Sequence, residues 1–377
     1  MPPWNERAAE RLRSPLLDRL RGEPGVWVVG GAVRDALLGR EPREYDVVVE
    51  GDALALARRI GGVEAIHERF GTATVDGNDV AAARTETYPA PGALPEVTLG
   101  ATLQEDLARR DFSVNTLAIR LADGAGAAWP GALDDLEAGR LRVLHERSFL
   151  DDPTRLLRMA RYAARLGFAP HPATAALARE AIAGGALATV SGPRIGAEMR
   201  LALREPLPAV LEALAADGLG AAAIHPAFRV PDVRPALPLA WLGAALLDAP
   251  ADVRRAALDR LAFPVAEREA VVAAAGARPL AAALAEAARP SEIARLARGR
   301  PPEALDVAAA LGAAEPVRRW TEELRHVRPA IGGDDLLAAG LSGPAVGAGL
   351  RAALDAALDG AAPDRDTQLR AALDGVP

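Results

Sequence analysis

Apolar and polar positions follow two alternating patterns over the first 145 residues of the chain. Two short apolar runs, VWVVGG (26–31) and YDVVVE (45–50), each predict a buried β-strand. Each run is followed by apolar residues at helical spacing, in AVRDALLG (32–39) and GDALALARRI (51–60), which predict helices. Strands and helices are therefore expected to alternate along this part of the chain.

Further segments of the same region add strands to the predicted sheet. TATV (72–75) and NDVAAAR (78–84) predict two strands, and the Asp-Gly pair between them predicts a tight turn. LQEDLARR (103–110) has a helical pattern, whereas FSVNTLAIRL (112–121) predicts a strand. The region is thus expected to form a small mixed sheet with helices.

The pattern changes from about residue 150 onward. Alanine and leucine recur at helical spacing up to the carboxyl end without a convincing strand, which predicts an all-α region and an α+β fold class for the whole chain. The longest apolar run, residues 236–247, is too short to span a bilayer, so we expect a core helix there and no membrane association. The proline-rich residues 225–235 break the helical pattern and mark an internal boundary.

Composition narrows the class of protein. The 377 residues include no cysteine, which excludes disulfides and thiolate zinc sites. The amino-terminal residues lack the apolar core of a signal peptide, so we expect a cytoplasmic protein, of unknown oligomeric state. A net charge of −7 argues against general nucleic-acid binding, but residues 140–165 carry seven arginines against three acids, a local positive charge suited to phosphates.

Two neighbouring features carry candidate chemistry. Gly30-Gly31 lies between a predicted strand and a predicted helix, where backbone N–H groups freed of side-chain bulk suit a phosphate and Arg34 adds a charge. An ordinary tight turn is the alternative. Glu44 and Asp46 are two residues apart on the next predicted strand, so both carboxylates face one side and can hold two magnesium ions. Together, a phosphate turn and a two-metal strand indicate nucleotidyl transfer.

Several long motifs, in this order, resemble those of the bacterial CCA-adding tRNA nucleotidyltransferases and their poly(A) polymerase relatives, in class II of the polymerase-β-like superfamily. The resemblance covers most of the chain. Its motifs are GGAVRDALLGREPREYDVVVEGDA (30–53), HERFGTATV (67–75), ARTETYPAPGALPEV (83–97), EDLARRDFSVNTLAI (105–119), ERSFLDDPTRLLRMARYAARLGF (146–168) and IGGDDLLAAGLSGPAVGAGLRAALDAALDG (331–360).

The resemblance implies a domain order. Residues 1–145 would form a catalytic nucleotidyltransferase head with a small mixed sheet, and residues 146–230 a helical neck for base recognition and RNA binding. Residues 231–377 would form a helical body and tail that bind tRNA. The implied activity is template-independent addition of CMP and/or AMP to the 3′ end of tRNA, with ATP and CTP as substrates and pyrophosphate as the leaving group.

The resemblance also assigns roles to single residues. Mg²⁺ would be held by Glu44 and Asp46, and Arg110 and Asp111 would complete the catalytic set. The nucleotide would be bound by Gly30, Gly31, Arg34, Arg110, Asn115, Asp152, Arg155, Arg158 and Arg161. Two weaker candidates are Asp79, as a third carboxylate, and Arg84, facing the nucleotide, whereas His67 is expected to be structural.

The base-reading role has a physical rationale. A carboxylate at Asp152 accepts from the exocyclic amine of cytosine or adenine, and Arg155 donates to ring nitrogens or carbonyls, so CTP and ATP are preferred over UTP and GTP. The other arginines share one face of the predicted helix, where like charges at i, i+3 repel until an anion or RNA lies opposite. The alternative is a solvated arginine face.

One residue departs from the family pattern. The family has aspartate at both metal positions, and here the first is Glu44, whose longer side chain moves the carboxylate by about one methylene. Three hypotheses follow: an active tRNA nucleotidyltransferase adding CCA, A only or CC only; a catalytically impaired paralogue that still binds tRNA or nucleotide; or a related enzyme, such as a poly(A) polymerase, with a different RNA acceptor. The intact neck motif argues against the second.

Overall fold

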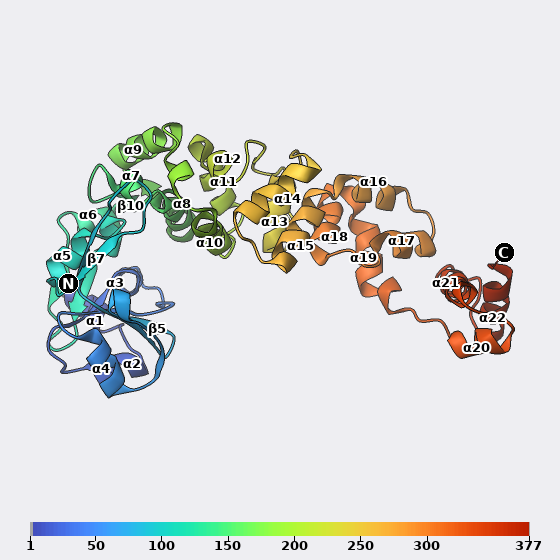
Figure 1. Ribbon diagram of the computed structural model, residues 1–377, viewed down its shortest axis with the longest axis horizontal. Helices are drawn as coiled ribbons and strands as arrows, with labels where there is room; N and C mark the ends of the chain where they lie inside the picture. The colour runs from blue at the N-terminus through green and yellow to red at the C-terminus, as the bar shows by residue number, and fades with distance from the viewer. Residues whose placement is uncertain (1–2, 377) are drawn as a thin grey trace. The chain divides into compact units, whose positions relative to one another are not determined.

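The computed structural model describes residues 3–376 and has a mixed sheet with helices in its amino-terminal part and helices in the remainder, so the predicted α+β class is confirmed (Figure 1). The chain divides into two compact units, unit 1 (Met1–Ala223) and unit 2 (Ile224–Pro377). This division falls immediately before the proline-rich residues 225–235. The functional division into head, neck, and body with tail stays a prediction.

Unit 1 is built on a seven-stranded sheet with the order β3-β4-β5-β2-β1-β8-β9. Strand β1 pairs antiparallel with both β2 and β8, whereas β2 pairs parallel with β5. A separate hairpin joins β6 to β7, and β10 pairs with β11. The strands are β1 (Val26–Val29), β2 (Asp46–Val49), β3 (Val63–His67), β4 (Thr72–Val75), β5 (Asn78–Ala82), β6 (Arg84–Thr87), β7 (Glu96–Leu99), β8 (Leu117–Arg120), β9 (Gly126–Ala128), β10 (Arg140–Leu141) and β11 (Ala169–Pro170).

The helices of unit 1 include the two predicted after the first strands, α3 and α4. Helix α8, which carries the arginine-rich motif, packs against α10 and α11. The helices are α1 (Trp4–Ala9), α2 (Pro15–Leu20), α3 (Gly31–Leu37), α4 (Ala53–Ile60), α5 (Leu103–Ala108), α6 (Ala132–Glu137), α7 (Ser148–Asp151), α8 (Thr154–Leu166), α9 (Pro172–Ala183), α10 (Gly192–Ala202), α11 (Ala209–Ala215) and α12 (Leu219–Ala223), with short 3₁₀ turns η1 (Glu68–Phe70), η2 (Ser113–Asn115), η3 (Ala186–Thr189) and η4 (Ala216–Gly218).

The register of the central strands decides where the candidate site forms. Val29, the last residue of β1, pairs with Asp46, the first residue of β2, and also with Ala118 of β8. The side chains of these strands pack on Leu103 and Leu107 of α5 in a small apolar core. As a result, the turn after β1, the start of β2 and the segment before β8 meet at one edge of the sheet.

The turn predicted between TATV and NDVAAAR is confirmed. Asp76 and Gly77 both have positive φ, 48° and 73°, as a tight turn between antiparallel strands requires. The predicted strand over 112–121 is correct only in its second half, because residues 113–115 form the 3₁₀ turn η2. The Asp111 carboxylate accepts from Phe112 N and Asn115 Nδ2 there, and these local hydrogen bonds replace strand pairing.

The all-α prediction beyond residue 150 is correct except for one two-residue strand, β11, which pairs with β10. Helix α13 is buried on all sides, as expected for the apolar run 236–247. The helices of unit 2 are α13 (Pro238–Ala245), α14 (Ala251–Arg260), α15 (Val265–Ala275), α16 (Arg278–Glu286), α17 (Pro290–Ala297), α18 (Pro302–Ala308), η5 (Ala309–Ala313), α19 (Ala314–Glu322), η6 (Leu324–His326), α20 (Gly333–Ala338), α21 (Pro344–Leu358) and α22 (Arg365–Asp374).

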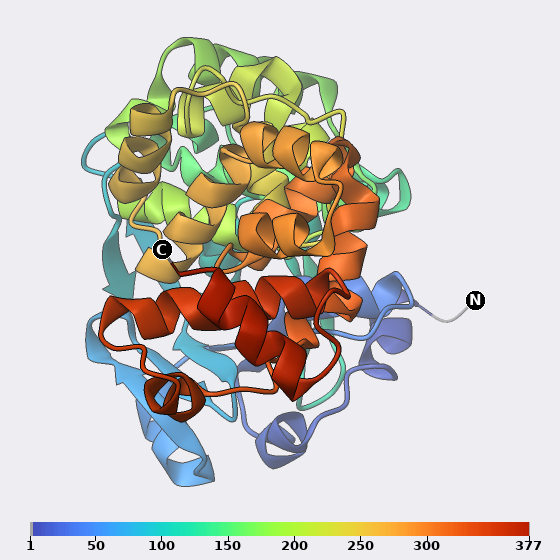
Figure 2. The same cartoon turned by 90° about the vertical axis from the view of Figure 1, so that its right-hand side faces the viewer.

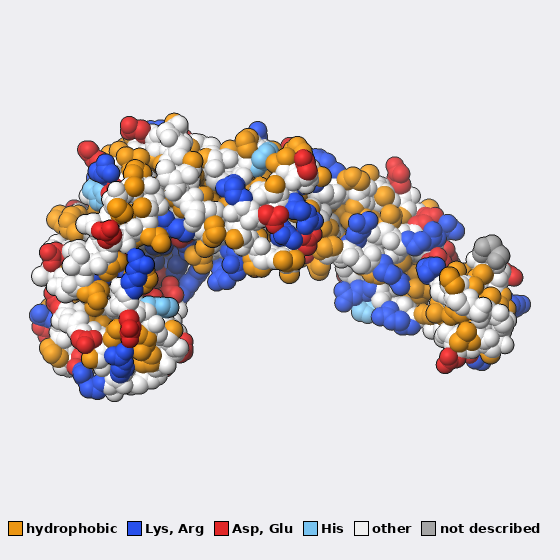
Figure 3. Space-filling view, in the orientation of Figure 1, with side chains coloured by type: hydrophobic (Ala, Val, Ile, Leu, Met, Phe, Trp, Pro, Cys, Tyr) orange, Lys and Arg blue, Asp and Glu red, His pale blue; other side chains and the backbone are white. Residues whose placement is uncertain are grey.

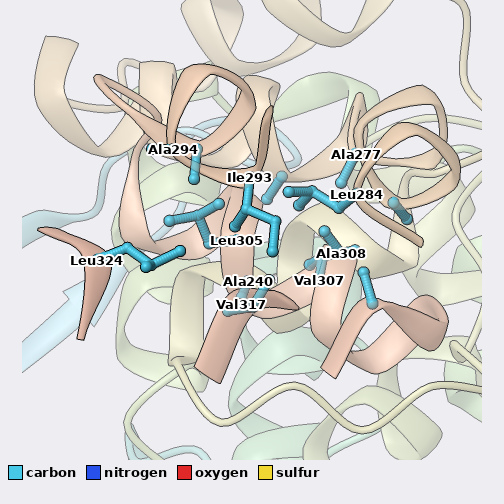
Figure 4. Packing of buried hydrophobic residues seen from close by; sticks show 14 of the residues in the cluster. Ala240, Ala277, Leu284, Ile293, Ala294, Leu305, Val307, Ala308, Val317 and Leu324 are labelled. Atoms are coloured by element: carbon cyan, nitrogen blue, oxygen red, sulfur yellow. The ribbon is translucent and has the colours of Figure 1, made fainter. Parts of the chain in front are cut away.

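Unit 2 contains two apolar clusters. The larger one joins α13, α15–α19 and the end of α21 at Leu358, with Leu284, Ile293 and Leu305 packed together within it (Figure 4). A smaller cluster around Leu336 holds α20, α21 and α22 together, and these three helices form one group at the carboxyl end in both views (Figures 1 and 2). No helix between residues 3 and 376 combines the length and apolar character needed to cross a bilayer.

Candidate functional site

A polar cavity of about 470 Å³ opens in unit 1 beside the edge of the sheet where β1, β2 and β8 meet. It is lined by charged residues from the sheet, from α3, from α8 and from Glu198 of α10. Several predicted site residues lie together on its wall, although their positions in the sequence are far apart. These are Gly31, Arg34, Glu44, Asp46, Asp79, Arg84, Arg110, Asp111, Asn115, Asp152, Arg155 and Arg158.

Two of the predicted residues, Gly30 and Arg161, do not line this cavity. Gly30 lies just behind the wall at φ 72° and ψ −128°, a conformation that favours glycine. A Cβ there would be 2.8 Å from Arg110 Nη1 and 3.7 Å from Asp46 Oδ2. The glycine therefore allows an arginine and a carboxylate to approach the turn between β1 and α3.

The carboxylates of Glu44, Asp46 and Asp79 lie in different local structures. Asp46 begins β2, whereas Glu44 lies before the strand and is exposed, so the predicted common strand face is wrong for Glu44. The parallel register of Val47 with Val80 places Asp79 of β5 beside Asp46. Burial raises the pKa of Asp46, Arg110 lowers it, and the nearby charges of Glu44 and Asp79 raise it further. Three carboxylates are therefore close enough to interact.

Glu50, which follows β2, lies outside the cavity and is exposed, but its carboxylate is hydrogen-bonded. Its carboxylate accepts from Trp27 Nε1 at 3.0 Å and from Leu103 N at 2.8 Å. These bonds fix α5 against β1, so Glu50 is structural. His67 is likewise outside the cavity, exposed at the end of β3.

The donor set at the start of β2 fits a hard divalent cation. It consists of the carboxylates of Glu44, Asp46 and Asp79, and oxygen ligands of this kind suit magnesium. Within residues 3–376 no three such side chains converge closely enough to enclose an ion by themselves. This agrees with the usual protein site for magnesium, in which one or two carboxylates act together with substrate phosphates.

A chain of buried polar contacts connects α3 to α8 across the cavity floor. Arg34, 1% exposed, donates through Nη1 to Asn115 Oδ1 and through Nε to Asp35. Asn115 Nδ2 donates to Asp111 Oδ1 at 2.9 Å, and Arg158 Nε donates to Asp111 Oδ2 at 2.8 Å. Burial alone would raise the pKa of Asp111, but Arg158 and Asn115 lower it to about 2. Asp111 is thus a fixed anion that ties the wall together.

Three arginines of α8 form ion pairs with carboxylates of the protein. Arg158 and Arg161 form ion pairs with Glu198 of α10, and Arg165 pairs with Asp35 of α3. Arg161 is buried and pairs in addition with Glu205. The repulsion expected along this helix is therefore relieved in part by carboxylates of the protein itself, and the binding of a nucleotide by these arginines stays a prediction.

Asp152 and Arg155 are held firmly before α8 and in its first turn. Asp152 Oδ1 accepts from Thr154 Oγ1 at 2.7 Å and from Arg194 Nη2 at 2.9 Å. Arg155 donates to Ser148 Oγ at 2.7 Å and to the carbonyl of Arg109 at 2.8 Å. No donor among residues 3–376 is hydrogen-bonded to Asp152 Oδ2, so this oxygen is left to accept from a ligand in the cavity.

Several residues that line the cavity were not predicted from the sequence. Glu86 and Tyr88 follow Arg84 at two-residue spacing, and this period places all three on one side of the β6 segment, a signal that was present in ARTETY. Tyr162 is one helical turn after Arg158 and was also detectable. Glu198 gave no such signal, because only the packing of α10 on α8 brings it to the cavity.

Comparison with known proteins gives matches that extend beyond the head. The model of the poly(A) polymerase head domain matches residues 26–142. A CC-adding tRNA nucleotidyltransferase of Deinococcus radiodurans is 39% identical over 93% of this chain and 90% of its own length. An A-adding tRNA nucleotidyltransferase of Geobacter sulfurreducens is 36% identical over 92% of this chain, but the chain spans only 45% of that protein.

Solved structures match over nearly the whole chain. An apo form of a CCA-adding enzyme has a TM-score of 0.83 at 28% identity and covers 98% of both chains. A Thermotoga maritima CCA-adding enzyme in complex with tRNA has a TM-score of 0.77 at 27% identity, covering 98% of this chain and 97% of its own. A CCA-adding enzyme with CTP has a TM-score of 0.80 at 27% identity, with the same coverage.

The match to the Deinococcus protein covers almost all of both chains, and the poly(A) polymerase head domain model matches residues 26–142. The chain therefore belongs to the family of bacterial tRNA nucleotidyltransferases with a poly(A) polymerase head domain.

Proposed function

We propose that this protein adds CMP and/or AMP to the 3′ end of tRNA without a nucleic-acid template. The observation that carries the proposal is a single cavity in which two kinds of chemistry meet. Glu44 and Asp46 lie on one side beside the glycine turn, and Asp152 and Arg155 lie on the α8 side. The first pair suits phosphoryl transfer, and the second suits recognition of a base edge.

In this reaction the 3′-hydroxyl of the RNA attacks the α-phosphorus of the nucleotide and pyrophosphate leaves. Catalysis of such a transfer rests on positioning and charge stabilisation. Arg110 lies behind Asp46 at the glycine turn and neutralises charge that develops on the phosphates. Asp46 and Glu44, with Asp79 beside them, would hold Mg²⁺, which lowers the pKa of the attacking hydroxyl and neutralises the triphosphate.

Base selection follows from the fixed geometry at the start of α8. Asp152 is held through one oxygen by Thr154 and Arg194, so its other oxygen can accept from N4 of cytosine or N6 of adenine. Uracil and guanine carry a carbonyl at the corresponding position, and two acceptors facing each other repel. CTP and ATP are therefore the expected substrates.

The Deinococcus and Geobacter relatives are named for adding different nucleotides, CC in the first and A in the second. Their names therefore support nucleotide addition to tRNA for this chain. Which nucleotides it adds is a question for experiment. The alternatives are an impaired paralogue in which Glu44 disables the site, and a poly(A)-polymerase-like enzyme with another RNA acceptor. The cytoplasmic location inferred from the sequence stays a prediction.

The test supplies purified protein and Mg²⁺ with tRNAs that end before CCA, after CC, or after the complete CCA. CTP and ATP are added singly and together, and the extended products are resolved by length. Addition of C only, A only or both identifies the subtype. Absence of extension on every tRNA, with retained tRNA binding, would establish the impaired paralogue, and extension of non-tRNA acceptors alone would establish the third alternative.

A further inference from the structure

Asp106 of α5 is a buried carboxylate that lies outside the cavity and holds two arginines. It is 0% exposed, and it is not among the residues that line the cavity. Its Oδ1 accepts from Arg109 Nε at 2.9 Å and Nη2 at 2.7 Å, and its Oδ2 accepts from Arg110 Nη2 at 3.1 Å. Burial would raise the pKa of Asp106, but Arg110 and Arg109 lower it, so the group is an anion at neutral pH.

Arg110, the first of the two arginines, lies at the end of the cavity that contains Glu44 and Asp46. Arg110 Nη1 lies where a side chain at Gly30 would have to be, and its charge acts on Asp46. Its Nε is buried and has no hydrogen-bond partner among residues 3–376. Among residues 3–376, Asp106 is the only carboxylate that forms an ion pair with Arg110, so this carboxylate sets the position of the guanidinium.

Arg109, the second arginine, contacts the end of the cavity that contains Asp152 and Arg155. The carbonyl oxygen of Arg109 accepts from Arg155 Nη2 at 2.8 Å, and its Nη1 donates to Glu86 Oε1 at 2.8 Å. Arg109 Nε and Nη2 both donate to Asp106 Oδ1, which closes a ring from the side chain of Arg109 back to its own helix at i−3. The backbone that carries the acceptor for Arg155 is therefore held by Asp106.

We propose that Asp106 is a positioning residue. It holds Arg110, which lies beside Asp46, in a fixed position relative to Arg109, whose carbonyl oxygen accepts from Arg155. This inference rests on the proposed function, because it assigns Asp106 to nucleotide selection and transfer. It gives the carboxylate a role beyond filling the core. One buried anion, acting through two consecutive arginines, connects the two ends of the cavity.

The substitution Asp106→Asn tests the inference because it keeps the shape and removes the charge. Two arginines would then face an amide, and one of them would meet an N–H donor, so both guanidinium groups would move. A displacement of about 1 Å at a reacting centre costs on the order of 10²-fold in rate. We therefore expect kcat/KM for CTP to fall about 10²-fold, and the preference for CTP over UTP to fall at least about tenfold.

The matched control is Asp135→Asn. Asp135 is also a buried aspartate of unit 1, held by Arg142 and Ser113, and neither Asp135 nor Arg142 lines the cavity. Both variants are expected to lower the unfolding temperature, but only Asp106→Asn should lower the preference for CTP over UTP. Equal preference in Asp106→Asn and Asp135→Asn would overturn the inference. If Asp106→Asn does not fold, Asp106→Glu keeps the charge and moves it, and a selectivity equal to the wild type would overturn the inference in the same way.

Calorimetric titration with CTP and with UTP separates this inference from the proposed function. A wild-type chain that extends no RNA counts against the proposed function only. The inference then still predicts that the ratio of the two dissociation constants shrinks in Asp106→Asn and is retained in Asp135→Asn. An unchanged ratio in Asp106→Asn, or a wild type that binds neither nucleotide, would overturn it.

Discussion

At the scale of single residues, the two carboxylates of the predicted metal pair are placed differently. Asp46 is set by strand pairing with Val29 and partly buried, whereas Glu44 is exposed and precedes the strand. The extra methylene of glutamate is easier to accommodate at an exposed position outside the sheet than inside it. The departure from the family pattern at Glu44 is therefore compatible with activity.

This placement gives the first prediction. Glu44→Asp should leave the rate of nucleotide addition unchanged or raise it, because the shorter side chain restores the family pattern without disturbing the sheet. The measurement is single-turnover addition to tRNA at saturating Mg²⁺. A large loss in Glu44→Asp would show that the cavity has been rebuilt around glutamate.

Asp111 gives a prediction of pH-dependent stability. Although burial opposes ionisation, Arg158, Asn115 and Arg155 lower its pKa in the folded state to about 2, below the unfolded value of about 3.9. Its ionised form therefore stabilises the fold above about pH 4, by on the order of 2 kcal/mol, and this contribution is lost as the pH falls from 4 toward 2. Asp111→Asn should flatten the pH dependence of the unfolding free energy in that window, as measured with urea.

Of the nucleotide- and metal-site residues predicted from the sequence, all but Gly30 and Arg161 line the cavity, because their spacing has a local meaning. The spacing along a strand predicted Asp46, and the order of the motifs predicted Asp152 and Arg155. Glu198 and Arg194 could not be found this way, since their ion pairs with Arg161 and Asp152 arise only when α10 packs on α8. For the same reason the ion pairs of Arg161 with Glu198 and Glu205 could not be predicted from the sequence.

At the scale of elements, the apolar periods placed β1, β2, α3 and α4 correctly, because each element has a buried face of its own. The strand prediction failed at residues 113–115, where the Asp111 side chain bonds the backbone and Asn115. An apolar pattern carries no information on such side-chain bonds. The same bonds place Asn115 and Asp111 in the cavity wall, so the misassigned segment is part of the site.

The turn between β1 and α3 gives a prediction for an element. Gly30→Ala should destabilise the fold by about 1–3 kcal/mol from backbone strain, and the new Cβ would also displace Arg110 and lower the rate of addition. Gly131→Ala is the control, since Gly131 also has positive φ, 78°, but open space for a Cβ. Urea unfolding and addition assays on both variants should show a smaller strain in Gly131→Ala, because side chains tolerate its left-handed helical backbone better, and loss of activity in Gly30→Ala alone.

At the scale of the whole molecule, an acidic chain of net charge −7 must contact a polyanion if the proposed function is correct. Basic side chains gather over the α17–α19 part of unit 2 (Figure 3). Among residues 3–376, no carboxylate is paired with Arg325 or Arg328, and both are exposed after α19. These arginines are available to phosphates, in keeping with the prediction that residues 231–377 bind tRNA.

The salt dependence of binding tests this prediction. The double variant Arg325→Ala/Arg328→Ala should bind tRNA more weakly, and its plot of log K against log salt should be shallower by roughly 1–2. Arg318→Ala is the control, because Arg318 is already paired with Glu315 and Glu322 and has less charge to offer. A double variant with the same slope as the wild type would show that tRNA does not contact this surface.

The central claim, nucleotidyl transfer at the cavity beside Asp46, is tested most directly by single-turnover incorporation of labelled CMP or AMP into tRNAs lacking part or all of CCA. The account predicts extension by the wild-type chain in Mg²⁺, and no extension by an Asp46→Ala variant that folds and binds tRNA as the wild type does. Extension by Asp46→Ala at the wild-type rate would contradict the account, as would a wild-type chain that extends none of these tRNAs.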